Sequence, residues 1–189
     1  MQKSIGISDL DLIRGCKSGD LKSQELLYKQ FYGYAMGVGM RYLSNRDDAM
    51  EVVNDSFIKA FNGIKFFNEN QPFRAWLRRI IVNTAIDCHR KNLKHQNQED
   101  IDLVVNHGKA AEALENLSAK DILRLLDKLP EIHRTVFNMY ELDGFNHDEI
   151  ADMLNIPVSS SRVYLSRAKD KLRAYILQQQ KRDYERAIR

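Results

Sequence analysis

Two segments of the chain combine cationic side chains with helical spacing, the combination from which nucleic-acid-binding surfaces are built. In residues 147–173, a short helix, a tight turn and a longer basic helix are predicted, which is the pattern of a helix-turn-helix. Small side chains at the start of the longer helix would permit close approach to a major groove, and flanking cations would neutralise phosphates. The side chains expected on this outer face and its edge are Ser159, Ser160, Arg162, Val163, Ser166, Arg167 and Lys169. The segment therefore indicates binding to duplex DNA, in preference to the alternative of a solvated amphipathic helix.

The second segment is a loop at 66–72 that leads into a predicted helix at 73–93. Residues 72–95 carry six Arg and Lys side chains against the single carboxylate of Asp87. Aromatic rings, amides and cations are what unstacked bases require, for stacking, for hydrogen bonds to base edges and for phosphate neutralisation. The candidates are Phe67, Asn68, Asn70 and Gln71 in the loop, and Arg79, Asn83 and Arg90 on a polar stripe of the helix. For Phe73 and Trp76 we favour a place in the core, whereas for Phe67 the residues leave core packing and base stacking equally open.

A third polar surface is acidic. Four carboxylates share one face of the predicted helix that carries the apolar residues Val52, Val53 and Phe57: they are Asp47, Asp48, Glu51 and Asp55. An acidic face is unsuited to DNA and would complement a basic protein partner. A solvated face without a partner is an equal alternative from the residues alone.

Apolar residues at helical spacing predict the elements that position these surfaces. The N-terminal stripes are Leu27, Phe31, Tyr34, Val38 and Tyr42, then Val53, Phe57, Ala60 and Phe61, then Phe73, Trp76, Leu77, Ile80, Ile81, Thr84 and Cys88. Pro130 is expected to open a helix that ends near Leu142 and directs Ile132, Val136, Phe137 and Tyr140 inward. Asn146 and Glu149 have capping-box spacing, which predicts a helix at 147–154. Ser159 is expected to cap the last helix, with Ser161, Leu165, Ala168 and Leu172 inward.

The composition is typical of an all-α protein. The 189 residues include only nine Gly and three Pro, and 43% are hydrophobic. The net charge of +3, from 29 Lys and Arg against 26 Asp and Glu, conceals the strongly basic segments. Residues 96–118 carry five carboxylates against Lys109, lack aromatics and read as a flexible linker. We therefore expect two small helical domains at 1–95 and 119–189, joined by an acidic linker at 96–118.

Other classes of protein fit the sequence less well. No segment approaches the roughly 18 consecutive apolar residues of a membrane span, and no secretory signal pattern is seen, so a cytoplasmic location is expected. Cys16 and Cys88 cannot build a disulfide framework or a zinc site alone. An operator-binding dimer would need a helical seam, and no sustained heptad is present. An enzyme is disfavoured because the five His residues are scattered, so neither catalysis nor a cofactor is expected.

Three segments give the chain a resemblance to a known family. They are 48–57, 73–90, and 129–137 followed by the helix-turn-helix and 165–173. Together they resemble the sigma-70 superfamily, specifically the extracytoplasmic-function (ECF, group 4) sigma factors, over about residues 12–177. The resemblance implies a sigma2-like helical bundle and a sigma4-like helix-turn-helix domain on a flexible linker. It also implies a promoter-specific transcription initiation factor that binds core RNA polymerase.

The resemblance implies a role for each candidate residue. Asp48, Glu51, Asp55 and Phe57 would lie on the helix that docks against the clamp helices of the largest polymerase subunit. The loop from Phe67 to Gln71 would hold a base flipped from the −10 strand, while Asn83 would read that strand and Arg79 and Arg90 would contact its backbone. Arg162 and Arg167 would face the −35 duplex, with Lys169 nearby. The polymerase flap region and an anti-sigma factor are further candidate partners. The chain departs from the family pattern at Met50 and Asn54, so the details of core docking follow less directly.

Overall fold

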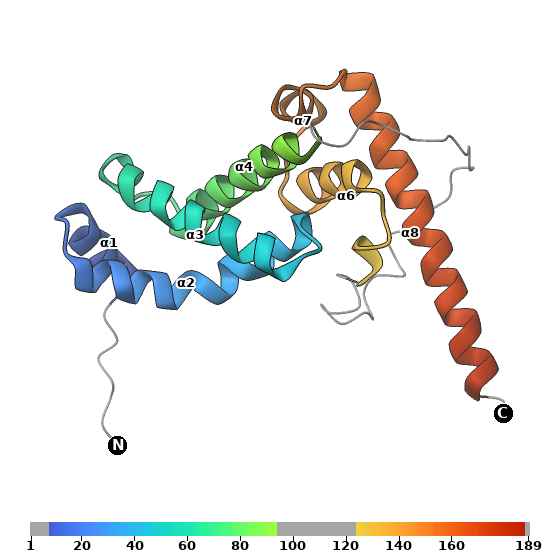
Figure 1. The fold of residues 1–189 in the computed structure, drawn as a ribbon, viewed down its shortest axis with the longest axis horizontal. Helices are drawn as coiled ribbons and strands as arrows, with labels where there is room; N and C mark the ends of the chain where they lie inside the picture. The colour runs from blue at the N-terminus through green and yellow to red at the C-terminus, as the bar shows by residue number, and fades with distance from the viewer. Residues whose placement is uncertain (1–7, 94–123, 188–189) are drawn as a thin grey trace. The chain divides into compact units, whose positions relative to one another are not determined.

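The computed structural model describes residues 8–93 and 124–187, and every regular element in these ranges is a helix (Figure 1). The chain divides into two compact units, Met1–Lys91 and Asn92–Arg189. The linker expected at 96–118 lies outside the described residues. Each unit is described by itself below.

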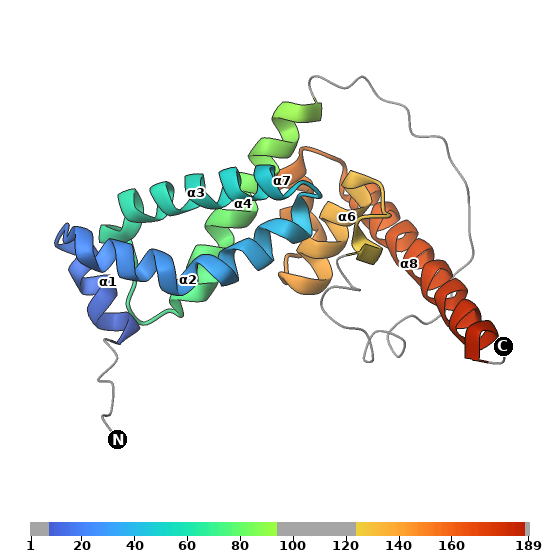
Figure 2. The same ribbon diagram turned by 60° about the horizontal axis from the view of Figure 1, so that its bottom comes forward.

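The N-terminal unit contains α1 (Asp9–Lys17), α2 (Leu21–Tyr42), α3 (Arg46–Gly63), the 3₁₀ turn η1 (Ile64–Phe66) and α4 (Phe73–Leu93). Local capping explains where the first three helices begin. The side chains of Ser8, Asp20 and Asn45 accept hydrogen bonds from backbone N–H groups in the first turns of α1, α2 and α3. Helices α2 and α3 pack side by side (Figure 2), and α1 packs against α2.

The core of this unit forms where the predicted apolar stripes meet. Leu27, Phe31, Val38 and Tyr42 of α2 are buried, as are Val53 and Phe57 of α3. The rings of Phe31 and Phe73 meet edge to face with centroids 4.9 Å apart, which joins α2 to the start of α4. The Tyr34 hydroxyl adds a bond of 3.3 Å to the Arg74 carbonyl oxygen. The predicted stripes therefore give the correct inward faces for these three helices.

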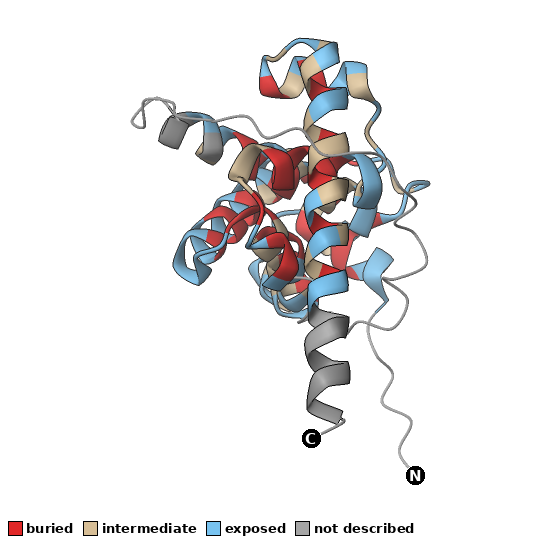
Figure 3. Cartoon of the chain, turned by 90° about the vertical axis from the view of Figure 1, so that its right-hand side faces the viewer, coloured by how far each residue is buried: buried red, intermediate tan, exposed pale blue. Residues whose placement is uncertain are grey.

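The C-terminal unit contains α6 (Glu131–Phe137), a π-helical turn η2 (Asn138–Leu142), α7 (His147–Leu154) and α8 (Val158–Ala187). Helices α6 and α7 both pack against α8. Buried residues recur every three or four positions along α8 where its side chains are described, so the helix has one buried side and one more exposed side (Figure 3). The buried side chains that hold the three helices together include Leu126, Val136, Met139, Ile150, Leu165, Ala168 and Leu172.

Two local predictions in this unit are wrong. The helix expected to continue to Leu142 widens after Phe137 into the π turn, in which the Asp143 N–H bonds the Asn138 carbonyl at 3.0 Å. The wider turn changes the helical register, so Tyr140, expected inward, is 38% exposed. Ser159 is not the cap of the last helix, because α8 already begins at Val158. The carbonyl of Pro157 accepts the first bond of the helix, from Ser161 N–H at 3.2 Å.

Candidate nucleic-acid interface

Helix α4 presents the polar stripe expected from the sequence. Arg79, Asn83, Asp87 and Arg90 are all exposed, while Leu77, Ile81, Val82 and Ala85 are buried on the opposite side. Lys59 of α3 reaches the edge of this stripe. Its Nζ lies 3.7 Å from an Asp87 carboxylate oxygen and donates to Thr84 Oγ1 at 3.1 Å. This contact with Lys59 partly offsets the only carboxylate on the stripe, so the face is cationic and rich in hydrogen-bonding groups.

The loop before α4 corrects one expectation. Phe67 is only 4% exposed, and its ring packs against Phe73 and Trp76 with centroid distances of 5.6 and 4.9 Å. Phe67 therefore belongs to the core and does not offer a ring face to a base. Its neighbour Phe66 is 91% exposed, and sequence reasoning missed it. The two adjacent Phe residues gave no signal of which one faces outward, because η1 interrupts the regular spacing between α3 and the loop.

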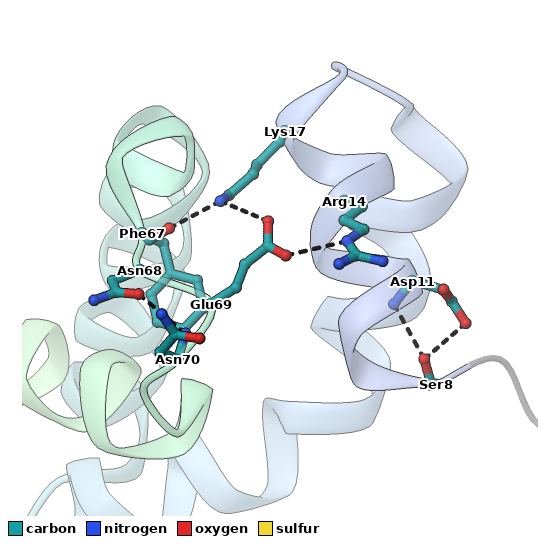
Figure 4. Close-up of polar contacts among 8 residues, drawn as sticks. All are labelled: Ser8, Asp11, Arg14, Lys17, Phe67, Asn68, Glu69 and Asn70. Carbon is teal, nitrogen blue, oxygen red and sulfur yellow. Dashed lines mark hydrogen bonds and ion pairs between the residues drawn. The ribbon is translucent and has the colours of Figure 1, made fainter.

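The amide residues of the loop are exposed and held in a defined turn. The Asn68 side-chain oxygen accepts from the Asn70 N–H at 3.0 Å (Figure 4). The Asn68 carbonyl accepts from the Gln71 N–H at 3.0 Å. Such Asx-type turns fix the backbone around a short polar side chain. Asn68, Asn70 and Gln71 are all exposed, so their remaining donors and acceptors face solvent. Pro72 immediately precedes α4, and its carbonyl accepts from the N–H groups of Ala75 at 3.0 Å and Trp76 at 3.3 Å in the first turn of that helix.

The helix-turn-helix has the predicted local geometry. Asn146 and Glu149 form a complete capping box at the start of α7, and Asn155 ends this helix in the left-handed conformation with φ of 54°. Ser161 of α8 is fully buried, as predicted, and its Oγ lies 2.9 Å from His147 Nδ1. This bond joins the start of α7 to the first turn of α8. The two helices are therefore fixed against each other where α8 begins its outer face.

The residues expected on the outer face of α8 differ in their exposure. Ser159, Arg162 and Val163 are exposed, whereas Ser160, Ser166, Arg167 and Lys169 are half-buried. The Nζ of Lys169 pairs with a Glu141 carboxylate oxygen of η2 at 2.7 Å. It also lies 6.0 Å from the centroid of the Tyr140 ring. Its charge is thus partly neutralised within the chain.

His147 lies beside this group of residues. Its ring stacks on Tyr140 with centroids 4.5 Å apart. Burial lowers the pKa of His147 below its ordinary value, and the positive charge of Arg162 lowers it further. The neutral imidazole is therefore the form that this structure favours, which suits a hydrogen bond with the Ser161 hydroxyl.

The acidic face lies on α3. Asp48, Glu51 and Asp55 are exposed as expected, and two exposed apolar side chains, Met50 and Ile58, lie on the same helix. Phe57 is a correction, because it is 2% exposed and its ring packs against Tyr28 with centroids 4.7 Å apart. It can support the helix from within but cannot contact a partner. The face that remains is acidic, and Ile58 extends it three residues beyond Asp55.

The residues that the structure describes offer neither a metal site nor a membrane span. In the described ranges, no group of three or more His, Cys, Asp or Glu residues could hold a metal ion. No helix in the same part of the chain is long and apolar enough to cross a membrane.

Comparison with known proteins assigns both units. The family described as Sigma-70 region 2 matches residues 27–95, and the family described as Sigma-70, region 4 matches residues 119–172. The chain is 30% identical to the ECF RNA polymerase sigma-E factor of Haemophilus influenzae, over 87% of this chain and 93% of that protein. It is 27% identical to the protein of the same name from Escherichia coli K12, over 87% and 92%.

A solved structure shares the fold. It is the co-crystal structure of the sigma factor RpoE with the anti-sigma factor NepR from Bartonella quintana. The match has a TM-score of 0.50 and 20% identity, and it covers 84% of this chain and 98% of that chain. The two family matches and the near full-length similarity to sigma-E factors show that this chain belongs to the ECF sigma factors of the sigma-70 family, which are transcription initiation factors for RNA polymerase and not enzymes.

Proposed function

We propose that this chain is a promoter-specificity subunit that reads two DNA elements after binding core RNA polymerase. Helix α8 contacts the −35 duplex, and α4 with the loop at 68–71 captures unstacked bases of the −10 strand. The observation that carries the proposal is that each unit has one helix, α4 or α8, with an outer face rich in polar and cationic side chains and a buried apolar face. The chain itself breaks and forms no covalent bond in this function.

The roles on the −10 strand follow from the chemistry of the exposed groups. Asn83 can hydrogen-bond base edges, while Arg79 and Arg90 neutralise phosphates. The loop amides supply further edge contacts. Phe66, in place of Phe67, supplies the exposed ring for stacking. Flipping a base costs a few kcal/mol, so these contacts and those with polymerase must together offset that cost.

The roles on the −35 duplex belong to the start of α8. The small side chains Ser159 and Ser160 allow the helix to enter the major groove, and Arg167 can reach a guanine edge. Arg162 contributes phosphate contacts. Two modules on one linker benefit from effective concentration, so each can bind DNA weakly alone. Tight promoter binding is therefore expected only for the complex with polymerase.

Core polymerase is the partner proposed for α3. The exposed carboxylates Asp48, Glu51 and Asp55 would complement a basic surface such as the clamp helices of the largest subunit. Ile58, three residues after Asp55, would add apolar contact area to that face. The flap region is the partner proposed for the C-terminal unit, and an anti-sigma factor would act by covering the same faces. The function is exercised in the cytoplasm, where polymerase and promoter DNA are found.

Run-off transcription tests the proposal. Core polymerase with this chain should initiate at specific promoters on genomic fragments, and Asn83→Ala and Arg167→Ala should reduce or redirect initiation. Matched controls are Asn62→Ala, an exposed amide on α3, and Lys128→Ala, an exposed cation outside α8. Normal opening by Asn83→Ala would contradict the −10 role, and unchanged promoter choice by Arg167→Ala would contradict the −35 role. A palindromic footprint without polymerase would instead support a dimeric operator-binding regulator.

A further inference from the structure

The loop that carries Asn68, Asn70 and Gln71 is tied to α1, a helix with no role in the function proposed so far. Arg14 Nε donates to one Glu69 carboxylate oxygen at 3.1 Å, and Lys17 Nζ donates to the other at 2.9 Å (Figure 4). Lys17 Nζ also donates to the backbone carbonyl of Phe67 at 2.8 Å. Two cations of α1 thus hold the loop at two points, a side-chain carboxylate and a backbone carbonyl.

The cations are presented by a helix that is itself firmly placed. Leu12, Ile13 and Cys16 of α1 are buried. Gly15 permits the close approach of α1 to the start of α2, because a Cβ at this position would lie 2.1 Å from Ser23 Oγ. Arg14 and Lys17 are in the last turn of α1, three residues apart, so both project from one side. Both cations therefore extend toward the loop from a helix whose position is set by its buried side.

The other end of the contact lies at the centre of the amide turn. Glu69 is between Asn68 and Asn70, whose exposed side chains are the candidates for contact with a base. The buried Phe67 ring attaches the loop to the core through its packing on Phe73 and Trp76. Exposed ion pairs contribute little to stability, but here one carboxylate with two cationic partners defines an orientation.

We propose that Glu69 is a positioning residue, held by Arg14 and Lys17, that sets the loop in the conformation that captures one unstacked base of the −10 strand. This inference rests on the proposed function. Hydrogen bonds from Lys17 and Arg14 hold the pKa of Glu69 below its ordinary value, as expected for a carboxylate that both cations stabilise in its charged form. Glu69 does not itself need to contact DNA, because it acts through the neighbouring amides.

The experiment measures base capture one nucleotide at a time. Holoenzyme made from core polymerase and the full chain is bound to single-stranded −10 oligonucleotides in which each position in turn is abasic. For the natural chain, one position should give the largest loss of affinity. Glu69→Gln should reduce that loss by about fivefold, the scale of the pairing it removes, and leave the losses at other positions unchanged. Lys17→Met should also reduce that loss, and because Lys17 and Glu69 share one contact, the effect of the double variant should be smaller than the sum of the two single effects.

Glu25→Gln is the matched control. Glu25 also pairs with two cations, Lys22 at 3.1 Å and Lys29 at 2.5 Å, but it lies on α2. The Glu25→Gln variant should leave the loss of affinity at every abasic position unchanged. The positioning role is overturned if Glu69→Gln preserves the loss at the captured position, or if it reduces the losses at all positions equally, as a general structural defect would. If the natural chain shows no position-dependent loss, the proposed −10 function itself fails, which is a different result from failure of Glu69 alone.

Discussion

Replacement of Phe67 by alanine is expected to lower the unfolding free energy of the N-terminal unit by about 3–4 kcal/mol. The ring is 4% exposed and packs on Phe73 and Trp76, and Phe→Ala changes in cores cost about 3–5 kcal/mol. With a urea dependence of about 1 kcal/mol per molar for a small unit, the midpoint should fall by about 3 M. Trp76 is the only Trp of the chain and adjoins the ring, so its fluorescence reports this transition directly. An unchanged midpoint would refute the assignment of Phe67 to the core.

Phe66→Ala is the matched comparison at the adjacent position. Because Phe66 is 91% exposed, its loss should change the unfolding free energy by no more than about 0.5 kcal/mol. Stacking on a base is worth about 1–3 kcal/mol, so holoenzyme containing this variant should bind a single-stranded −10 oligonucleotide at least about fivefold more weakly. If Phe66→Ala instead destabilised the unit and left oligonucleotide binding normal, Phe66 would be a core residue and the proposed stacking role would be wrong.

Three further predictions concern single positions. Gly37→Ala should raise the unfolding free energy by about 0.5–1 kcal/mol, because an added Cβ meets nothing within 4 Å and alanine favours the helix; a lower melting temperature would contradict this. Asn146→Ala should destabilise the C-terminal unit by about 1 kcal/mol in urea unfolding, because it removes the cap of α7, whereas Asn146→Asp should be nearly neutral. The lowered pKa of His147 means that the unfolded chain takes up a proton first, so this unit should lose stability as the pH falls below about 6.5. His147→Gln should flatten that pH dependence, and an unchanged slope would show that another group causes it.

The sequence predicted the elements best where one local signal determined the backbone. Helix α7 runs from His147 to Leu154 as expected, because its capping box and the left-handed Asn155 mark both ends. The inward stripe of α8 was also correct, including Ser161, whose burial is satisfied by His147. The polar stripe of α4 is exposed because regular helical spacing continues without interruption from Phe73 to Leu93.

The predictions that were wrong or missing concern positions where the helical spacing of apolar residues is interrupted, or contacts between residues distant in sequence. The π turn exposed Tyr140, and the 3₁₀ turn left Phe66 outside and Phe67 inside, although no local pattern distinguished them. The pairing of Glu69 with Arg14 joins residues 55 positions apart. A pair so distant in sequence cannot be found from periodicity, because only the packing of α1 brings its cations to the loop.

The central claim is that this chain directs core RNA polymerase to a promoter and that the two together open it. The most direct measurement is permanganate reactivity of thymines in a promoter duplex, with core polymerase alone, with the chain alone and with both. The account predicts reactive thymines in the −10 region only when both are present, and their loss when either the −10 or the −35 sequence is scrambled. Reactivity with the chain alone, or opening that is indifferent to both sequences, would contradict it.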